Sequence, residues 1–204
     1  MWQYEKRLEY PVNIKQTDPK TAQYILSQYG GPDGEINASL RYLSQRYSIP
    51  YREVAGLLTD IATEEIAHFE MIATIVHQLT RDLTPEEIKA SNFGPYYIDH
   101  TLAVWPQAAG GVPQNACEFQ SKGDPITDLM EDMAAEQKAR TTYDNILRVV
   151  KDPDVVDPIR FLRAREVVHF QRFGEALSII QSKLDSNNYY FYNPEFDKNC
   201  SCKK

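Results

Sequence analysis

The sequence predicts an all-α protein built as a four-helix bundle with one long connection. Apolar residues recur at spacings of three and four along several long segments, which is the periodicity of amphipathic helices. No segment alternates apolar and polar residues strongly enough to predict a strand. A chain of 204 residues with 42% hydrophobic content is long enough for one sizeable core, and two full domains would be cramped.

The first half of the chain is predicted to hold three helices. Asp18-Pro19 combines an N-cap residue with proline at the first helical position, and Gly30-Gly31 ends this short helix. A second helix begins near Glu35 and ends before Pro50, and a third spans roughly 51–80. We therefore expect two shorter helices followed by one long helix.

The second half is predicted to hold two long helices after an irregular stretch. Residues 91–124 contain Gly94-Pro95 and Gly110-Gly111, and a connection of this length is usually functional or a crossover. Asp124-Pro125 begins a helix that runs to about residue 150, and the last helix covers about 155–184. The long connection therefore joins the second and third helices of the bundle.

Composition divides the chain into an N-terminal arm (1–17), the helical bundle (18–185) and a polar tail (186–204) with tyrosine and cysteine. The tail carries Cys200 and Cys202, but a structural zinc site needs four ligands, so a frayed tail is favoured over a binding site. Thiol crosslinking in an oxidised assembly stays open.

Charge and hydropathy exclude several classes of partner. The net charge of −7 and the pI near 5.2 argue against nucleic acid or an anionic membrane surface as the main partner. No stretch approaches the roughly 18 apolar residues of a membrane span, and no secretory signal is apparent at the N-terminus. We expect synthesis in the cytoplasm.

Two Glu-x-x-His pairs stand where an apolar stripe would otherwise continue. Glu65 and His68 interrupt the stripe of residues 51–80, and Glu166 and His169 interrupt that of the last helix. Residues three apart project from one face of a helix, so each pair is directed into the predicted bundle. A buried carboxylate without a partner is too costly to tolerate, which predicts that these groups bind something in the interior.

Two further glutamates repeat the pattern. Glu35 precedes Glu65 by 30 residues, as Glu136 precedes Glu166, which is the order expected of a bundle with approximate two-fold symmetry. Four carboxylates and two imidazoles then converge from four helices, as in di-iron and di-manganese bundle proteins. Two divalent ions would balance the four negative charges. Oxygen and nitrogen donors suit manganese or iron, and the spacing does not choose between them.

Other titratable residues are predicted not to be ligands. Glu64 falls off the face that carries Glu65 and His68, and we expect it to be a surface or supporting residue. His77 lies about 180° around the helix from His68. His100 is expected to be a hydrogen-bonded loop residue in the irregular stretch.

These motifs resemble those of the manganese catalases, and within that family the short spore-coat members of the CotJC type. The resemblance covers about residues 18–185. The motifs that carry it are Gly30-Gly31-Pro32-Asp33-Gly34-Glu35 with Tyr42, Glu64-Glu65-Ile66-Ala67-His68, Ala135-Glu136 and Glu166-Val167-Val168-His169. The resemblance implies a ferritin-like bundle with two manganese ions that disproportionates hydrogen peroxide to water and dioxygen.

The resemblance also implies a role for each site residue. One ion would be bound by Glu35 and His68, the other by Glu136 and His169, with Glu65 bridging them. Glu166 would be the catalytic residue that handles protons, whereas in di-iron relatives the matching glutamate binds metal. Tyr42 would hydrogen-bond beside the ligands, and an ordinary core tyrosine is the alternative reading.

The chain departs from the family in two respects. Ala135 stands where some members carry an arginine beside the solvent channel, and the long C-terminal extension that wraps neighbouring subunits is replaced by the polar tail. The resemblance still implies a homo-oligomer, a hexamer in the family, and a final location in the spore coat with other coat proteins as partners.

Two other functions remain open. One is a di-iron oxidase or peroxidase. The other is a structural coat protein whose metal site supports folding, in which peroxide chemistry could crosslink the tail residues Tyr189, Tyr190 and Tyr192.

Overall fold

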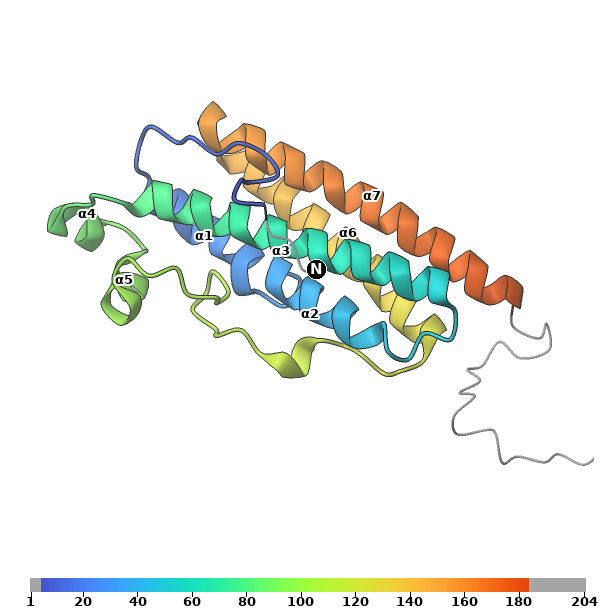
Figure 1. Ribbon diagram of the computed structural model, residues 1–204. Helices are drawn as coiled ribbons and strands as arrows, with labels where there is room; N and C mark the ends of the chain where they lie inside the picture. Colours follow the sequence, from blue (N-terminus) through green and yellow to red (C-terminus); the bar gives the residue numbers. More distant parts are fainter. Residues whose placement is uncertain (1–4, 184–204) are drawn as a thin grey trace, which may run out of the picture.

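Local sequence signals set the ends of the first two helices. The computed structural model describes residues 5–183. The Asp18 carboxylate accepts hydrogen bonds from the backbone N–H groups of Lys20 and Thr21, which caps α1 (Pro19–Gly30). After a break of four residues, α2 (Glu35–Gln45) begins with Glu35 in its first turn. Both helices pack on α3 (Arg52–Thr80) and follow one another along it (Figure 1).

The break between α1 and α2 depends on glycine. A Cβ atom on Gly30 would overlap the backbone of Pro106 and Gln107 in the crossover, and one on Gly31 would overlap the carbonyl of Ser27. The absence of side chains lets the crossover lie directly against the helix end. The break therefore directs α2 so that Glu35 begins a new helix inside the bundle.

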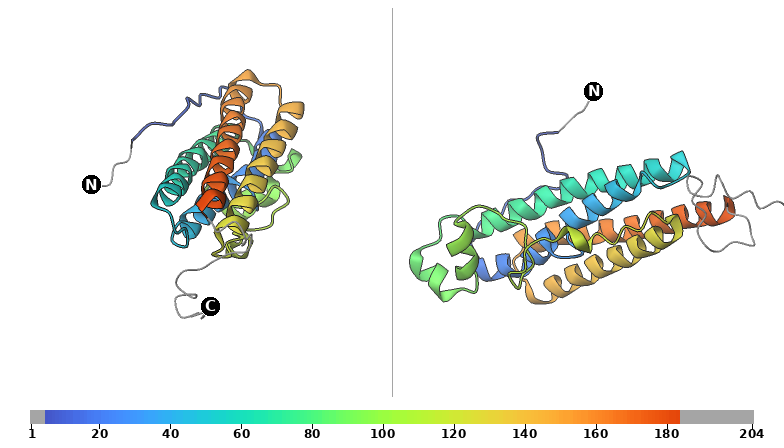
Figure 2. Two further views of the ribbon diagram at one scale, coloured as in Figure 1. Left: turned by 90° about the vertical axis from the view of Figure 1, so that its right-hand side faces the viewer. Right: turned by 90° about the horizontal axis from the view of Figure 1, so that it is seen from below.

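The remaining helices complete the bundle. The described chain continues through α4 (Pro85–Ala90), α5 (Gly94–His100), the 3₁₀ turn η1 (Ala116–Glu118), α6 (Pro125–Val149) and α7 (Pro153–Lys183). The short helices α4 and α5 lie at one end of the bundle, and the connection from α5 to α6 runs along its side to the other end (Figures 1 and 2). Residues 5–183 contain no strand, only an isolated bridge between Gln107 and Pro113. The predicted all-α, ferritin-like bundle with a long crossover is confirmed.

The crossover is more ordered than the sequence predicted. Gly94-Pro95 suggested an irregular stretch, yet Pro95 lies in the first turn of α5, where its missing N–H costs nothing. His100 ends this helix and stacks on the Trp105 ring, with centroids 5.3 Å apart. Arg41 of α2 donates from Nε to the backbone oxygen of Phe119 at 2.7 Å, which fixes the crossover shortly before α6.

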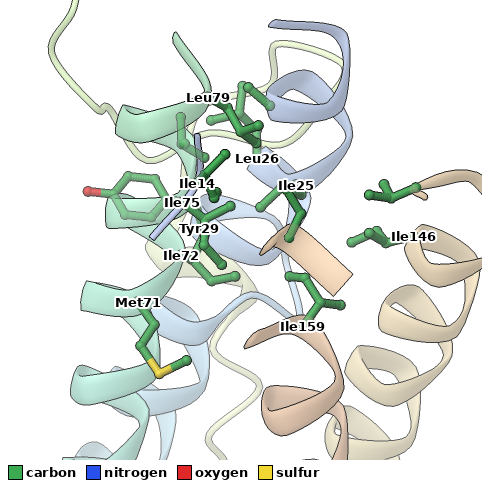
Figure 3. Packing of buried hydrophobic residues seen from close by; sticks show 14 of the residues in the cluster. Ile14, Ile25, Leu26, Tyr29, Met71, Ile72, Ile75, Leu79, Ile146 and Ile159 are labelled. Atoms are coloured by element: carbon green, nitrogen blue, oxygen red, sulfur yellow. The ribbon is translucent and has the colours of Figure 1, made fainter. Parts of the chain in front are cut away.

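Two apolar clusters fill the bundle, one toward each end. The first joins α1 to the C-terminal half of α3 and includes the fully buried Ile25, Ile72 and Ile159 (Figure 3). The second joins α2 to the N-terminal half of α3 and includes Leu58 and Phe173. Each fully buried aliphatic or aromatic side chain contributes about 1.5–3 kcal/mol. The predicted site residues lie in the sequence between the two clusters on every main helix, so a polar layer separates two apolar cores.

The N-terminal arm packs across the outside of the bundle. Ile14 is fully buried, and its backbone N–H donates to Gln78 Oε1 of α3 at 2.6 Å. Tyr10 stacks on Phe161 of α7 with ring centroids 4.9 Å apart. The predicted tail, with its tyrosines and with Cys200 and Cys202, lies outside the described residues. Within the described part of the chain, no helix combines the length and apolar character that a membrane crossing requires.

Candidate metal centre

The six residues singled out by spacing come together in the polar layer. All six side chains are at most 2% exposed. They are Glu35 of α2, Glu65 and His68 of α3, Glu136 of α6, and Glu166 and His169 of α7. The four bundle elements thus each supply one or two of these side chains, which is the convergence that the apolar stripes predict.

Glu65 lies between the two imidazole rings. Its Oε2 atom is 2.7 Å from Nδ1 of His68, and its Oε1 atom is 2.8 Å from Nδ1 of His169. The arrangement around it is nearly symmetric. Glu35 Oε2 is 3.6 Å from His68 Nδ1, and Glu136 Oε2 is 3.5 Å from His169 Nδ1. Each imidazole therefore turns Nδ1 toward two carboxylates, one of which is shared.

Burial and mutual repulsion perturb the acidic groups. Burial, followed by the charge of Glu65, raises the pKa of Glu35 to about 7. Burial, followed by the charges of Glu136 and Glu35, raises the pKa of Glu166 well above its usual range. Glu166 has an oxygen within 4.8 Å of ligand-type atoms of Glu35, Glu65 and His68, so this carboxyl adjoins the other groups.

The two histidines show how strongly the site attracts positive charge. Burial alone would lower the pKa of His169, but Glu65, Glu136 and Glu64 raise it to about 12. The pKa of His68 is raised well above its usual range against the same effect of burial, chiefly by Glu65. Without bound cations, protons on the imidazoles must offset the carboxylate charges. Divalent ions on the Nδ1 side would replace those protons.

The donor set fits a metal centre. Several buried polar atoms in the described residues lack a hydrogen-bond partner, among them Glu136 Oε2 and Glu166 Oε1. Glu65 Oε1 and His169 Nδ1 lie 2.8 Å apart, but their geometry is not that of a hydrogen bond. Buried polar atoms are normally paired, so a cluster of unpaired carboxylate and imidazole atoms indicates a missing ligand. Glu65, His68 and His169 offer atoms close enough to hold one ion, as do Glu35, Glu65, His68 and Glu166. These hard and borderline donors suit manganese or iron.

A pair of buried tyrosines supports the outer carboxylates. Tyr42, which the sequence placed near the ligands, donates its hydroxyl to Glu136 Oε1. Tyr143 donates in the same way to Glu35 Oε1. Tyr143 is a fully buried residue of α6 to which the sequence analysis gave no role at the site. The signal was present, because Tyr143 follows Glu136 by seven residues just as Tyr42 follows Glu35.

Glu64, which the sequence predicted to be a surface or supporting residue, contacts both imidazole rings from the side opposite Glu65 and is therefore a supporting residue. Its Oε1 atom is 3.6 Å from His68 Nε2, and its Oε2 atom is 3.3 Å from His169 Nε2. Arg165 approaches the same carboxylate, with Nε 2.5 Å from Oε1. Burial acts against ionisation, but contacts with His169, His68 and Arg165 hold the pKa of Glu64 below its usual range. Glu64 directly precedes Glu65 on α3. The imidazole ring of His169 from α7 lies between the two glutamates and contacts both.

An open groove of about 1260 Å³ borders the site between the N-terminal arm and α3. Its lining includes Glu9 and Val12 of the arm and Thr63, Ala67 and Glu70 of α3. Glu9 Oε2 is 3.4 Å from His68 Nε2, so the groove reaches the outer edge of the polar layer.

Comparison with known sequences places the chain near several catalases. The family model described as manganese-containing catalase matches residues 1–198. Protein CotJC of Bacillus subtilis (strain 168) is 52% identical over 190 residues, which cover 93% of this chain and all of that protein. A probable manganese catalase of Clostridium acetobutylicum is 28% identical over 191 residues, covering 93% of this chain and 85% of the relative.

Solved structures agree with this placement. The crystal structure of wild-type KatB, a manganese catalase from Anabaena, superimposes with a TM-score of 0.84 at 29% identity, over 95% of this chain and 85% of that one. A dodecameric thioferritin from Bacteroides fragilis superimposes with a TM-score of 0.55 at 19% identity, over 83% of this chain and 94% of that one. The latter likeness concerns the fold alone.

Proposed function

This chain belongs to the family of manganese-containing catalases, and from that premise we propose that it disproportionates hydrogen peroxide at a dinuclear manganese centre. Two peroxide molecules would yield two water molecules and one dioxygen molecule. The observation that carries the proposal is the nearly symmetric set of buried donors around Glu65.

We assign five side chains as metal ligands. Glu35 and His68 would bind one ion, Glu136 and His169 the other, and Glu65 would bridge the two. The assignment is supported by the 2.7 Å and 2.8 Å contacts that place the two Glu65 oxygens against different imidazoles. Tyr42 and Tyr143 each hold one oxygen of an outer glutamate, which leaves the other oxygen directed to the centre.

Glu166 is proposed to handle protons rather than to bind metal. The bound ions supply the redox chemistry, since together they can accept or deliver the two electrons that each peroxide exchanges. Burial raises the pKa of Glu166, which favours the protonated carboxyl, and such a group would pass its proton to a peroxide oxygen. Among the described residues the Glu166 Oε1 atom has no hydrogen-bond partner, which leaves it available for that contact. The apolar clusters flank the polar layer on two sides.

Oxygen evolution from peroxide tests the proposal. We expect manganese-loaded protein to produce dioxygen far faster than the same concentration of free manganese. Glu166→Gln should keep its manganese and lose at least about tenfold in kcat, because general acid–base groups contribute about 10²–10⁴-fold. Glu175→Gln is the matched control, since this exposed residue lies on the same helix. A wild-type rate equal to that of free manganese would refute the catalase proposal.

Iron is the alternative metal, because the same oxygen and nitrogen donors suit it. Elemental analysis of protein purified without added metal separates the two. Iron in place of manganese, with peroxidase activity, would favour a di-iron enzyme. A metal-loaded protein inert to peroxide would favour a structural coat protein.

We also propose a homo-oligomer located in the spore coat. The 52% identity with protein CotJC supports this location, together with the resemblance to the short spore-coat members of the family. Light scattering of the purified protein gives the number of subunits, and fractionation of spores that carry a tagged chain gives the location. Partner coat proteins would be sought by crosslinking in those fractions.

A further inference from the structure

The two imidazole rings lie between two consecutive glutamates. On the inner side, both Nδ1 atoms face Glu65 at 2.7 Å and 2.8 Å. On the outer side, both Nε2 atoms face Glu64, His68 at 3.6 Å and His169 at 3.3 Å. The rings are nearly parallel, with an interplanar angle of 22° and centroids 5.5 Å apart. One carboxylate is therefore aligned with the outer edges of both rings.

We propose that Glu64 is the positioning residue of both histidines, an inference that rests on the proposed metal centre. A histidine that binds metal through Nδ1 carries its remaining proton on Nε2. Both Nε2–H groups would then be directed at Glu64, with one of its oxygens available to each. The observed distances are longer than an ideal hydrogen bond, so a small rotation of the rings or of Glu64 completes the contact. A single carboxylate thus sets the tautomer and orientation of a ligand on each ion.

Arg165 neutralises the charge of the Glu64 carboxylate. Glu64 adds a negative charge next to a site that already contains four carboxylates, and Arg165 offsets it at 2.5 Å. Arg165 precedes Glu166 on α7 just as Glu64 precedes Glu65 on α3, so the two halves of the bundle differ at this position. A second carboxylate at position 165 would add another negative charge. Arg165 also limits the directions in which Glu64 can turn.

Glu9 does not position both histidines in this way. Its carboxylate lies 3.4 Å from His68 Nε2, but within residues 5–183 it makes no ion pair with His169. It also belongs to the N-terminal arm rather than to a bundle helix. Among the described residues, Glu64 is the one whose carboxylate faces the Nε2 atoms of both rings, which is why the inference concerns this residue.

The experiment measures manganese affinity by competition with a chelator in full-length protein. We expect Glu64→Ala to weaken manganese binding about 10–100-fold, the usual effect of removing such a support. Glu64→Gln should recover part of this loss, because its amide oxygen can still accept one of the two hydrogen bonds. Asp60→Asn is the matched control and should bind as wild type does, since Asp60 is an exposed carboxylate one turn earlier on α3.

Arg165→Gln separates positioning from mere ion pairing. If Glu64 acts only through its ion pair, Arg165→Gln and Glu64→Ala should lower the thermal stability of metal-free protein equally and change manganese affinity equally. Positioning predicts that Glu64→Ala weakens manganese binding several-fold more than Arg165→Gln does. Equal affinities of the two variants, or a Glu64→Ala affinity within twofold of wild type, would overturn the inference. Failure of wild-type protein itself to bind manganese would instead overturn the proposed metal centre.

Discussion

Tyr143→Phe tests the hydrogen bond that sequence reasoning overlooked. Tyr143 is fully buried and donates its hydroxyl to Glu35 Oε1. Phenylalanine keeps the ring and therefore the packing, so the substitution removes the donor without opening a large cavity. Glu35 is left with an unsatisfied oxygen in a layer where few other donors are available.

The expected cost depends on the charge of Glu35. A hydrogen bond to a charged group contributes about 1.5–3 kcal/mol and a neutral one about 0.5–1.5 kcal/mol. The pKa of Glu35 in metal-free protein is raised to about 7 by burial and by Glu65. At pH 8.5 the carboxylate is ionised and at pH 5.5 it is protonated, so the loss of stability should be about 1 kcal/mol larger at the higher pH. For a chain of this size, the larger loss lowers Tm by about 3–12 °C.

Thermal and urea unfolding of metal-free protein at both pH values measures the effect. Tyr47→Phe is the control, because Tyr47 is 82% exposed and should change stability little. Tyr42→Phe is the counterpart in the other half of the site, and we expect a loss of similar size at pH 8.5. If Tyr143→Phe unfolds like wild type at pH 8.5, the hydroxyl does not support Glu35 and the reasoning is refuted.

Three further predictions concern charge, access and backbone packing. Because Glu35 binds its proton more tightly in the folded state than in the unfolded state, this residue should lower the stability of metal-free protein by up to about 1.4 kcal/mol per pH unit between pH 4.5 and 7. Urea unfolding in the presence of a chelator measures this slope, and a stability that rises over the same interval would contradict the assignment. Ala67→Phe should narrow the groove beside the N-terminal arm and lower kcat/KM for peroxide without loss of manganese; an unchanged kcat/KM would show that substrate uses another route. Gly30→Ala should destabilise the protein by about 1–3 kcal/mol, because the new methyl group would overlap the backbone of the crossover. Gly56→Ala adds its methyl group in open space, so its Tm in a thermal scan should equal or exceed that of wild type. Equal Tm values for these two glycine variants would argue against the close approach at Gly30.

Much of the architecture follows from local chemistry. Asp18-Pro19 and Asp124-Pro125 begin α1 and α6 as expected, because an aspartate side chain can cap the backbone N–H groups that a helix start leaves unpaired. The apolar stripes gave the helix faces, and the two Glu-x-x-His pairs lie on those faces in the interior. Helical periodicity is enough to predict that these four side chains converge.

Side-chain contacts between segments that are distant in the sequence were harder to predict than the helices and their buried faces. Glu64 meets His169 because α7 packs against α3 at a particular depth, which the periodicity of either helix alone does not determine. The placement of Glu9 over His68 depends on where the arm crosses the bundle, and the arm has no periodic pattern. Tyr143 differs from these, because its spacing from Glu136 repeats that of Tyr42 from Glu35 and could have been used.

The near repetition of the two halves has an evolutionary consequence. Each helical hairpin carries a glutamate, a tyrosine seven residues later, and a Glu-x-x-His pair, so two identical hairpins could in principle assemble a complete donor set. An ancestral chain of half this length, acting as a dimer, would be sufficient for such a site. Glu64 and Arg165 occupy equivalent positions in the two halves and carry opposite charges. In a strictly symmetric ancestor, either two acids or two guanidinium groups would meet there, and neither pair would be balanced.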